Sequence, residues 1–236
     1  GTSNEDGTIN TTSTLVDTTS GISISTYSGT GVAATIGHGL GAVPQAVLVK
    51  KLDTATSQWM VYHSGNTSAP ETEFLVLDKT NATSDYPAWN DTLPTSTVFS
   101  LGTDSTVNAS GVKYVAYAFA DVEGYSKFGA YTGNGLVDGT YVYTGFAPEL
   151  IICKPTTGLR NWDMKSTGVD PFNTMTKTFY ANDGAAVQTQ SNVDFLSNGF
   201  KFRTTADINK AGVPTIYFAW AKNPFGGAST TPGTAK

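Results

Sequence analysis

Short apolar segments alternate with dense turn signals along the chain, a pattern typical of β-strands. Residues 46–52 and 150–154 are continuous apolar runs of strand length. Asn-Gly and Asp-Gly pairs mark the turns between such runs. No window sustains a helical period, and residues 181–190 are expected to hold one helical turn at most. The pattern predicts an all-β protein, an antiparallel β-sandwich of jelly-roll-like type.

Residues 112–120 differ from a half-exposed strand because both of their faces are apolar. Val115, Tyr117 and Phe119 face one way, and Tyr114 alternates with alanines on the other face. A strand that is apolar on both faces is expected at the centre of a sheet, covered on both sides. The pattern recurs near the end of the chain, in residues 217–221.

The sequence contains one domain-sized pattern twice. A Tyr-x-Gly-x-Gly string leads through a proline to an apolar run that ends in lysine, then to a tryptophan, a phenylalanine, an asparagine, a glycine and a second apolar run. A period of about one hundred residues is the size of a domain and too long for a solenoid repeat. The first copy has Tyr27, Gly29, Gly31, Pro44, Lys50, Trp59, Phe99, Asn108, Gly111 and residues 115–120, and the second has Tyr131, Gly133, Gly135, Pro148, Lys154, Trp162, Phe200, Asn209, Gly212 and residues 216–221.

The repeat predicts two tandem antiparallel β-sandwich domains related by internal duplication. Residues 21–124 are expected to form the first and residues 125–225 the second. Residues 1–20 are rich in Thr, Ser, Asn and Asp, so we expect a polar N-terminal arm. Residues 226–236 have a similar composition and are expected to form a flexible tail.

The residues that occur in both copies have structural explanations. Trp59 and Trp162 are large enough to fill the two cores. Lys50 and Lys154 end apolar runs, so their ammonium groups are expected to extend into solvent. Repetition in both halves favours a role in the fold, because each copy must build the same core.

Composition narrows the function classes. Charged residues make up only 14% of the chain, and the net charge is −5. Binding to a nucleic-acid backbone depends on Lys and Arg, so no nucleic-acid partner is expected. Cys153 is the only cysteine, which excludes an intrachain disulfide, and it is expected to pack as a small apolar side chain. We expect no membrane insertion and no cofactor.

The candidates for catalysis are weak. His38 lies in a glycine-rich turn, and its match in the second copy is Val142, so the position does not require an imidazole. His63 follows a strand and matches Ser166. The loop carboxylates of the first copy have no matching set in the second, and the sequence has no nucleophile, metalloprotease or phosphate-loop motif. We predict no enzymatic activity, no catalytic residue and no metal site.

Function is expected in residues that the two copies do not share. The clearest unshared segment is residues 85–91, which contain Tyr86, Trp89, Asn90 and Asp91. An exposed aromatic pair beside amide and carboxylate groups suits a sugar-binding surface, because the ring stacks on the sugar and the polar groups bind its hydroxyls. The same composition suits a subunit contact. A third possibility is that Trp89 closes one end of the sandwich. All three remain open.

Strings spread over nearly the whole chain resemble a domain of structural proteins from marine tailed bacteriophages, cyanophages included. They cover about residues 22–227. The strings are YVAYAFA at 114–120, GYSKFGAYTGNG at 124–135, TGFAP at 144–148, FLSNGF at 195–200 and FAWAKNPFGG at 218–227.

The resemblance implies a non-enzymatic virion protein, located in the extracellular particle as a tail fibre, an appendage or a surface decoration. Such a protein is expected to assemble with copies of itself, as a trimer, and with other virion proteins. Host recognition through a surface glycan is a further expectation, carried by Tyr86 and Trp89. The alternative class is a secreted, lectin-like carbohydrate-binding module.

Overall fold

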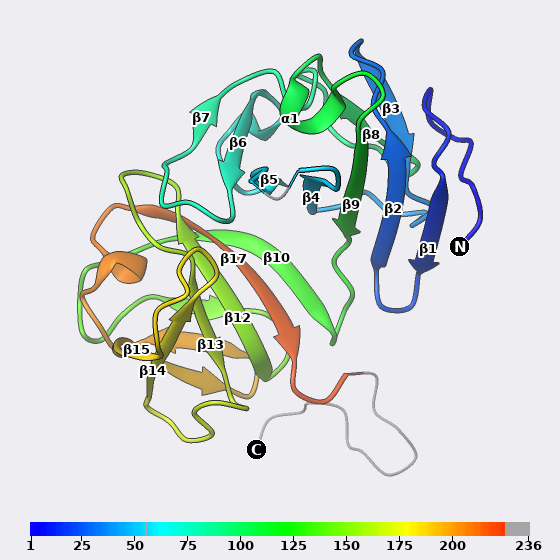
Figure 1. The fold of residues 1–236 in the computed structure, drawn as a ribbon. Coiled ribbons are helices and arrows are strands. Elements are labelled where there is room, and N and C mark those ends of the chain that lie inside the picture. Colours follow the sequence, from blue (N-terminus) through cyan, green and yellow to red (C-terminus); the bar gives the residue numbers. More distant parts are fainter. Residues whose placement is uncertain (55, 225–236) are drawn as a thin grey trace. The chain divides into compact units, whose positions relative to one another are not determined.

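The protein is all-β, built from antiparallel sheets with a few short helical turns, as the sequence pattern predicts. This computed structural model describes residues 1–54 and 56–224, which form two compact units (Figure 1). Unit 1 consists of Gly1–Leu77 and Thr83–Asp121, and unit 2 consists of Asp78–Ala82 and the chain from Val122 onward. The predicted tail, residues 226–236, lies outside the described residues.

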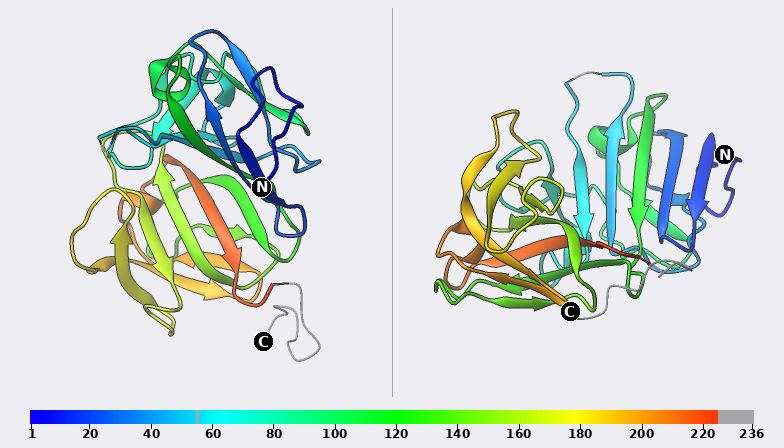
Figure 2. Two further views of the ribbon diagram at one scale, coloured as in Figure 1. Left: turned by 45° about the vertical axis from the view of Figure 1, so that its right-hand side comes forward. Right: turned by 90° about the horizontal axis from the view of Figure 1, so that it is seen from below.

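Unit 1 contains a seven-stranded sheet and a separate pair of strands. The sheet has the order β1-β2-β9-β4-β5-β6-β7, and its blue to green strands stand side by side in the right-hand view of Figure 2. The pair is β3-β8. The elements are β1 Ser13–Asp17, β2 Ile22–Ser28, β3 Ala34–Gly37, β4 Ala46–Lys51, β5 Met60–His63, η1 Pro70–Thr72, β6 Glu73–Val76, β7 Ser84–Asp85, β8 Val98–Leu101, α1 Ser105–Asn108 and β9 Lys113–Phe119.

Unit 2 contains one eight-stranded antiparallel sheet with the order β10-β17-β12-β13-β14-β15-β16-β11. If β1 is set aside, the neighbours follow the same order as in unit 1, with β15 pairing β16 where β7 and β8 stay apart. The elements are β10 Ser126–Thr132, β11 Tyr141–Tyr143, β12 Pro148–Pro155, β13 Asp163–Ser166, β14 Met175–Tyr180, β15 Gln188–Leu196, β16 Gly199–Phe202, η2 Asp207–Asn209 and β17 Pro214–Ala221.

The two strands that are apolar on both faces lie inside their sheets. β9 pairs with β2 on one side and with β4 on the other. β17 pairs with β10 and β12 in the same way. The prediction of central strands is confirmed for both. The helical turn expected in residues 181–190 is absent, since that segment has irregular backbone and then enters β15.

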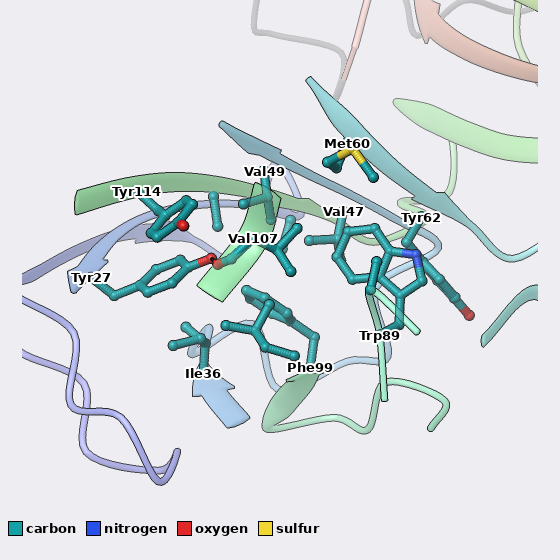
Figure 3. Close-up of a cluster of buried hydrophobic side chains, with 14 of the residues drawn as sticks. Tyr27, Ile36, Val47, Val49, Met60, Tyr62, Trp89, Phe99, Val107 and Tyr114 are labelled. Atoms are coloured by element: carbon teal, nitrogen blue, oxygen red, sulfur yellow. Dashed lines mark hydrogen bonds between the residues drawn. The ribbon is translucent and has the colours of Figure 1, made fainter. Parts of the chain in front are cut away.

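The core of unit 1 receives side chains from both of its sheets. Ile36 and Phe99 come from the β3-β8 pair, and Val47 and Tyr114 come from β4 and β9 (Figure 3). The ring of Tyr27 stacks on Tyr114 at a centroid distance of 5.1 Å. Burial of these large rings contributes to the hydrophobic driving force for folding.

Aromatic side chains also fill the core of unit 2. The ring of Tyr131 lies 5.0 Å from that of Phe202, and Phe200 packs edge-on against Tyr217 at 5.5 Å. Trp162 is fully buried, as expected, and contacts Phe218 at a centroid distance of 6.2 Å. Trp59, by contrast, is only partly buried and packs on Tyr117.

One tyrosine hydroxyl braces each core, and the hydrogen bond is equivalent in the two units. The hydroxyl of Tyr27 donates to the carbonyl of Val107, and that of Tyr131 donates to the carbonyl of Ile208. Each hydroxyl thereby ties a strand to the helical turn beside it. These bonds satisfy the polar tips of two otherwise apolar side chains, so their burial carries no unpaired group.

Asn108 and Asn209 are buried and hold the loop that follows the Tyr-x-Gly-x-Gly string. The side chain of Asn108 accepts from the N–H of Thr30 and donates to the carbonyl of Val32. That of Asn209 accepts from the N–H of Asn134 and donates to the carbonyl of Leu136. An amide suits this position because it supplies a donor and an acceptor on one side chain.

The residues expected to form a polar N-terminal arm instead belong to the fold of unit 1. Ser13–Asp17 forms β1, which pairs along its whole length with β2. Upstream, Ile9 is buried and forms a parallel bridge with Ile36 of β3. Thr and Ser residues suit a strand on the sheet edge, where their hydroxyls bond to one another, as Thr14 does to Ser25. A polar composition therefore did not mean a free arm.

Candidate functional site

The predicted aromatic loop does not present an aromatic pair to solvent. Trp89 is only 2% exposed and packs edge-on against Tyr62 at 6.0 Å, inside the core drawn in Figure 3. Its indole N–H donates to the carbonyl of Glu73. Trp89 therefore does not form part of an exposed surface. Of the three possibilities left open by the sequence, its burial fits the third, in which the ring fills the core and the carbonyl of Glu73 accepts from the indole.

The other three predicted residues are exposed. Tyr86 is 49% exposed and rests edge-on against Phe74 at a centroid distance of 6.1 Å. Asn90 and Asp91 lie further along the same segment and have left-handed backbone angles, with φ values of 55° and 46°. Asn and Asp tolerate this conformation better than other side chains except glycine. Their presence here is thus explained by the turn, and one exposed aromatic ring remains from the predicted pair.

The two lysine–tryptophan pairs are a repeated structural device. The ammonium of Lys50 lies 5.4 Å from the ring centroid of Trp59, and that of Lys154 lies 5.9 Å from the ring of Trp162. Lys50 donates to the carbonyl of Ser57, and Lys154 donates to that of Arg160. Each lysine thus closes the loop between two strands while its charge faces an aromatic ring.

Lys154 does not extend into solvent as predicted. It is fully buried, and its ammonium also donates to the carbonyl of Thr80, at 3.0 Å. Burial, with a smaller contribution from the charge of Arg160, lowers the pKa of Lys154 from 10.5 to about 8. This burial cannot be predicted from the local sequence, because the acceptor lies in a segment more than seventy positions away.

Unit 2 has a buried polar pair where unit 1 is apolar. Asp163 and Lys165 are two residues apart on β13, so their side chains point to the same face, and both are buried. By strand register, Cys153 pairs with Asp163 as Val49 pairs with Met60 in unit 1. The unit 1 residues at the two positions are therefore Met60 and Tyr62, which belong to its apolar core.

An irregularity in β15 provides the partners of this pair. The register of β14 with β15 shifts between Met175 and Lys177, which leaves residues 190–192 outside regular pairing. The carbonyl of Gln190 accepts from the ammonium of Lys165 at 2.8 Å. The hydroxyl of Ser191, a residue with a left-handed φ of 57°, bonds the carboxylate of Asp163. Bulges of this kind re-aim backbone groups.

Burial dominates the protonation of this cluster. It raises the pKa of Asp163 from 3.8 to about 6, against the opposing effects of Ser191 and of the two lysines. It lowers the pKa of Lys165 from 10.5 to about 8, although Asp163 favours the charged form. Burial also raises the pKa of the Cys153 thiol well above its usual range, which keeps the sulfur protonated and unreactive. The cluster therefore holds β15 in place and is closed to a dissolved substrate.

Both histidines have structural partners. His38 is buried, its Nδ1 accepts from the N–H of Leu40, and its Nε2 lies 3.2 Å from the carbonyl of Thr95. Burial lowers its pKa, so the neutral ring is favoured. His63 is fully buried, and its Nδ1 accepts from the N–H of Gly65.

The structure corrects the residue that matches His38. Phe99 pairs with Ile36, and Phe200 pairs with Val142, so Val142 occupies the place of Ile36. The match of His38 is then Thr144, whose hydroxyl interacts with the backbone two residues later as the imidazole does. Relative to unit 1, unit 2 has extra residues before β11 and fewer residues after it. An alignment of the two copies at one constant offset therefore misplaces this strand.

The fold and these contacts define an all-β protein. Polar side chains at equivalent positions of its two units hold the strands and loops of each unit together. The model of one family, described as a domain of unknown function (DUF7483), matches residues 1–224, and the chain belongs to this family. That match spans both units. Neither the curated proteins nor the solved structures contain a match to the chain.

Proposed function

We propose that this protein is a non-enzymatic structural component of a bacteriophage particle. It would serve in a tail fibre, an appendage or a surface decoration, by self-assembly and attachment. The proposal starts from the resemblance of the sequence strings to marine phage proteins. Strings 114–120 and 218–227 cover parts of the central strands β9 and β17, and string 124–135 covers β10. The resemblance is thus carried by the framework of each unit.

The proposal includes an internal duplication into two jelly-roll-like β-sandwiches. The shared strand order supports it, as do the matched hydrogen bonds of Tyr27 with Tyr131 and of Asn108 with Asn209. The core of unit 1, which lies between side chains of two sheets, supports the sandwich assignment for that unit.

The functional proposal depends on one observation, which is that the polar side chains repeated in both units bond to the main chain of their own unit. The matched tyrosines, asparagines and lysines all donate hydrogen bonds to main-chain carbonyls of their own unit. What is repeated is therefore a scaffold. A protein that repeats its scaffold and varies its surface is suited to assembly.

Large apolar side chains on the surface suit contacts with other subunits. Leu159, Phe172 and Tyr143 are among the most exposed, with 78%, 77% and 64% of their surface accessible. Interfaces are enriched in aromatic residues, and association is driven by burial of such surface. We propose that copies of the chain associate as trimers, and that the trimers bind other virion proteins.

The proposal is tested on particles of the phage that encodes this chain. Mass spectrometry of purified particles should find the protein in a copy number divisible by three, and labelled antibody should mark tail fibres, appendages or the particle surface in electron microscopy. Absence of the protein from purified particles would refute the assignment. Light scattering of the purified protein tests self-assembly separately, since a species of 24.8 kDa at every concentration would exclude the trimer.

The alternative, a lectin-like module, is kept because Tyr86, Asn90 and Asp91, which belong to one segment, are all exposed. An exposed ring next to amide and carboxylate groups is suited to stacking on a sugar. A glycan array of the isolated protein separates the two classes. Saturable binding that Tyr86→Ala abolishes would favour the lectin, whereas a pure scaffold should bind no glycan.

A further inference from the structure

The two units differ in what covers the edge strand next to their matching phenylalanines. In unit 1 this edge strand is β3, and the N-terminal segment Gly7–Ile9 runs beside it. The N–H of Ile9 donates to the carbonyl of Thr35 at 3.1 Å, and Ile9 forms a parallel bridge with Ile36. The N–H of Thr35 donates to the hydroxyl of Thr8 at 2.8 Å. The chain thus closes its own edge here.

The packing along β3 is tight and depends on glycine. A Cβ on Gly37 would meet the side-chain oxygen of Asn4 at 1.6 Å, and a Cβ on Gly7 would meet the carbonyl of Thr35 at 2.4 Å. Both distances are impossible for a real side chain. The atoms nearest to a Cβ on Gly37 belong to Asn4 and Asp6, so it is the chain before Gly7 that excludes a large residue at the position of Gly37.

In unit 2 the corresponding edge strand, β11, is open. Among the described residues β11 pairs only with β16. By the register that matches Ile36 to Val142, Tyr141 stands in the place of Thr35 and Tyr143 in the place of Gly37. Tyr141 is 42% exposed and Tyr143 is 64% exposed. Where unit 1 needs a glycine under a covering segment, unit 2 has an exposed tyrosine.

The backbone of β11 is prepared for a further strand. The N–H groups of Phe202 and Thr144 bond the carbonyls of Thr140 and Asn198, so residues 140, 142 and 144 direct their backbone groups toward β16. Residues alternate in this respect, so Tyr141 and Tyr143 direct their N–H and C=O groups outward. A short strand edge with unpaired backbone groups is a site for strand addition.

We propose that β11 accepts an extended segment of a separate polypeptide, bound parallel to the strand. The segment has the chemistry of Gly7–Ile9, which is a small residue, a hydroxyl residue and a branched apolar residue. Unit 1 shows this geometry within the chain itself. Leu136 and Val137, in the loop before β11, are exposed apolar residues. The inference goes beyond the proposed function, because it depends on strand register alone. It would hold even if the protein were absent from phage particles.

The test uses the full chain and a fluorescent peptide with the sequence of residues 7–12, which leaves out Asn4 and Asp6. Tyr143→Pro removes the outward N–H of β11, and proline is tolerated where an edge N–H faces solvent. Tyr143→Val is the matched control, since it also removes the ring but keeps the N–H. Binding measured by anisotropy should be saturable in the wild type and the valine variant, and weakened at least about tenfold in the proline variant. A peptide with Ile9→Pro, which lacks the donor to Tyr141, should not bind.

Hydrogen exchange with and without the peptide gives a second measurement that does not depend on a variant. The amide of Tyr143 should exchange more slowly when the peptide is bound. Absence of binding, equal loss in both Tyr143 variants, or protection of Gly37 in place of Tyr143 would overturn the proposal. Dimers of the chain that Tyr143→Pro dissolves would also overturn it, since a second copy and no separate partner would then fill the edge.

Discussion

Trp89 lies in the core although the two residues that follow it, Asn90 and Asp91, are polar and exposed. Asn90 and Asp91 beside it make the segment look like a surface loop, and that was the basis for predicting an exposed aromatic pair. Their left-handed backbone explains the polar residues, and the space between Tyr62 and the carbonyl of Glu73 explains the indole. The local composition correctly indicates a turn. It does not indicate which of the two rings, Tyr86 or Trp89, is buried.

Tyr86 and Trp89 should therefore respond differently to truncation. Trp89→Ala removes a buried ring and leaves a cavity, which should lower the free energy of unfolding by about 3–5 kcal/mol. Tyr86→Ala removes a half-exposed ring and should cost less than about 1 kcal/mol. Urea unfolding of both variants checks this. Equal losses would mean that the two rings share one environment, contrary to their burial.

The buried pair in unit 2 makes a prediction about pH. Burial lowers the pKa of Lys165 from 10.5 to about 8, so between these values the unfolded lysine keeps a proton that the folded lysine has released. The wild type should therefore gain stability as the pH rises through this window. The double variant Asp163→Asn, Lys165→Met lacks this gain, and its stability relative to the wild type should fall by about 2 kcal/mol from pH 8 to pH 10.

Lys113→Met, at an exposed position, is the control for this pH series and should follow the wild type in urea unfolding at both pH values. A double variant that also runs parallel to the wild type would show that Lys165 keeps its proton when folded. The buried tyrosines lose stability at higher pH in all variants, and the comparison between variants cancels their effect.

At the scale of elements, strands were predictable and their partners were not. β9 and β17 are apolar on both faces, and a strand with two apolar faces must be covered on both, so their central place followed from the sequence. β1 was missed because hydroxyl residues on an edge strand bond to each other and need no apolar pattern. The irregularity of β15 could not be predicted from the sequence of β15. Its only sign in the sequence is the pair Asp163 and Lys165 on β13, whose side chains bond to it.

The paired asparagines should be as important as core rings. Asn209→Ala leaves the carbonyls of Leu136 and Thr204 without their donor, and Asn108→Ala does the same to Val32 and Gly102. Each variant should lose about 2–4 kcal/mol of unfolding free energy, because a buried side chain is removed and main-chain carbonyls lose their donors. Asn10→Ala, at an exposed position, should stay within about 0.5 kcal/mol. Thermal or urea unfolding that shows no difference from Asn10→Ala would contradict the bracing role.

At the scale of the whole molecule, the sequence repeat indicated two units but not their exact composition. Domain boundaries were expected at single points in the chain, since a repeat is read along the sequence. The structure assigns Asp78–Ala82 to unit 2 although the residues on both sides belong to unit 1. The reason is local, because the carbonyl of Thr80 accepts from the ammonium of Lys154 and from the N–H of Arg160.

A fragment of residues 122–224 should accordingly be less stable than unit 2 in the full chain. It lacks Thr80, so the buried ammonium of Lys154 loses one of its two main-chain acceptors, at a cost of about 1–3 kcal/mol. Urea unfolding of the fragment and of the full chain, each followed through Trp162, measures the difference. The variant Lys154→Met should reduce the difference in unfolding free energy between the fragment and the full chain. A fragment as stable as the full chain would exclude a role for Asp78–Ala82.

The same segment sets an order on folding at the ribosome. Domains usually fold one after another as they leave the exit tunnel. Here Asp78–Ala82 is translated with unit 1, but its docking partners Lys154 and Arg160 are made only after unit 1 is complete. These five residues therefore cannot dock until unit 2 has been synthesised. A nascent chain that contains only unit 1 has an undocked segment in the middle of its sequence.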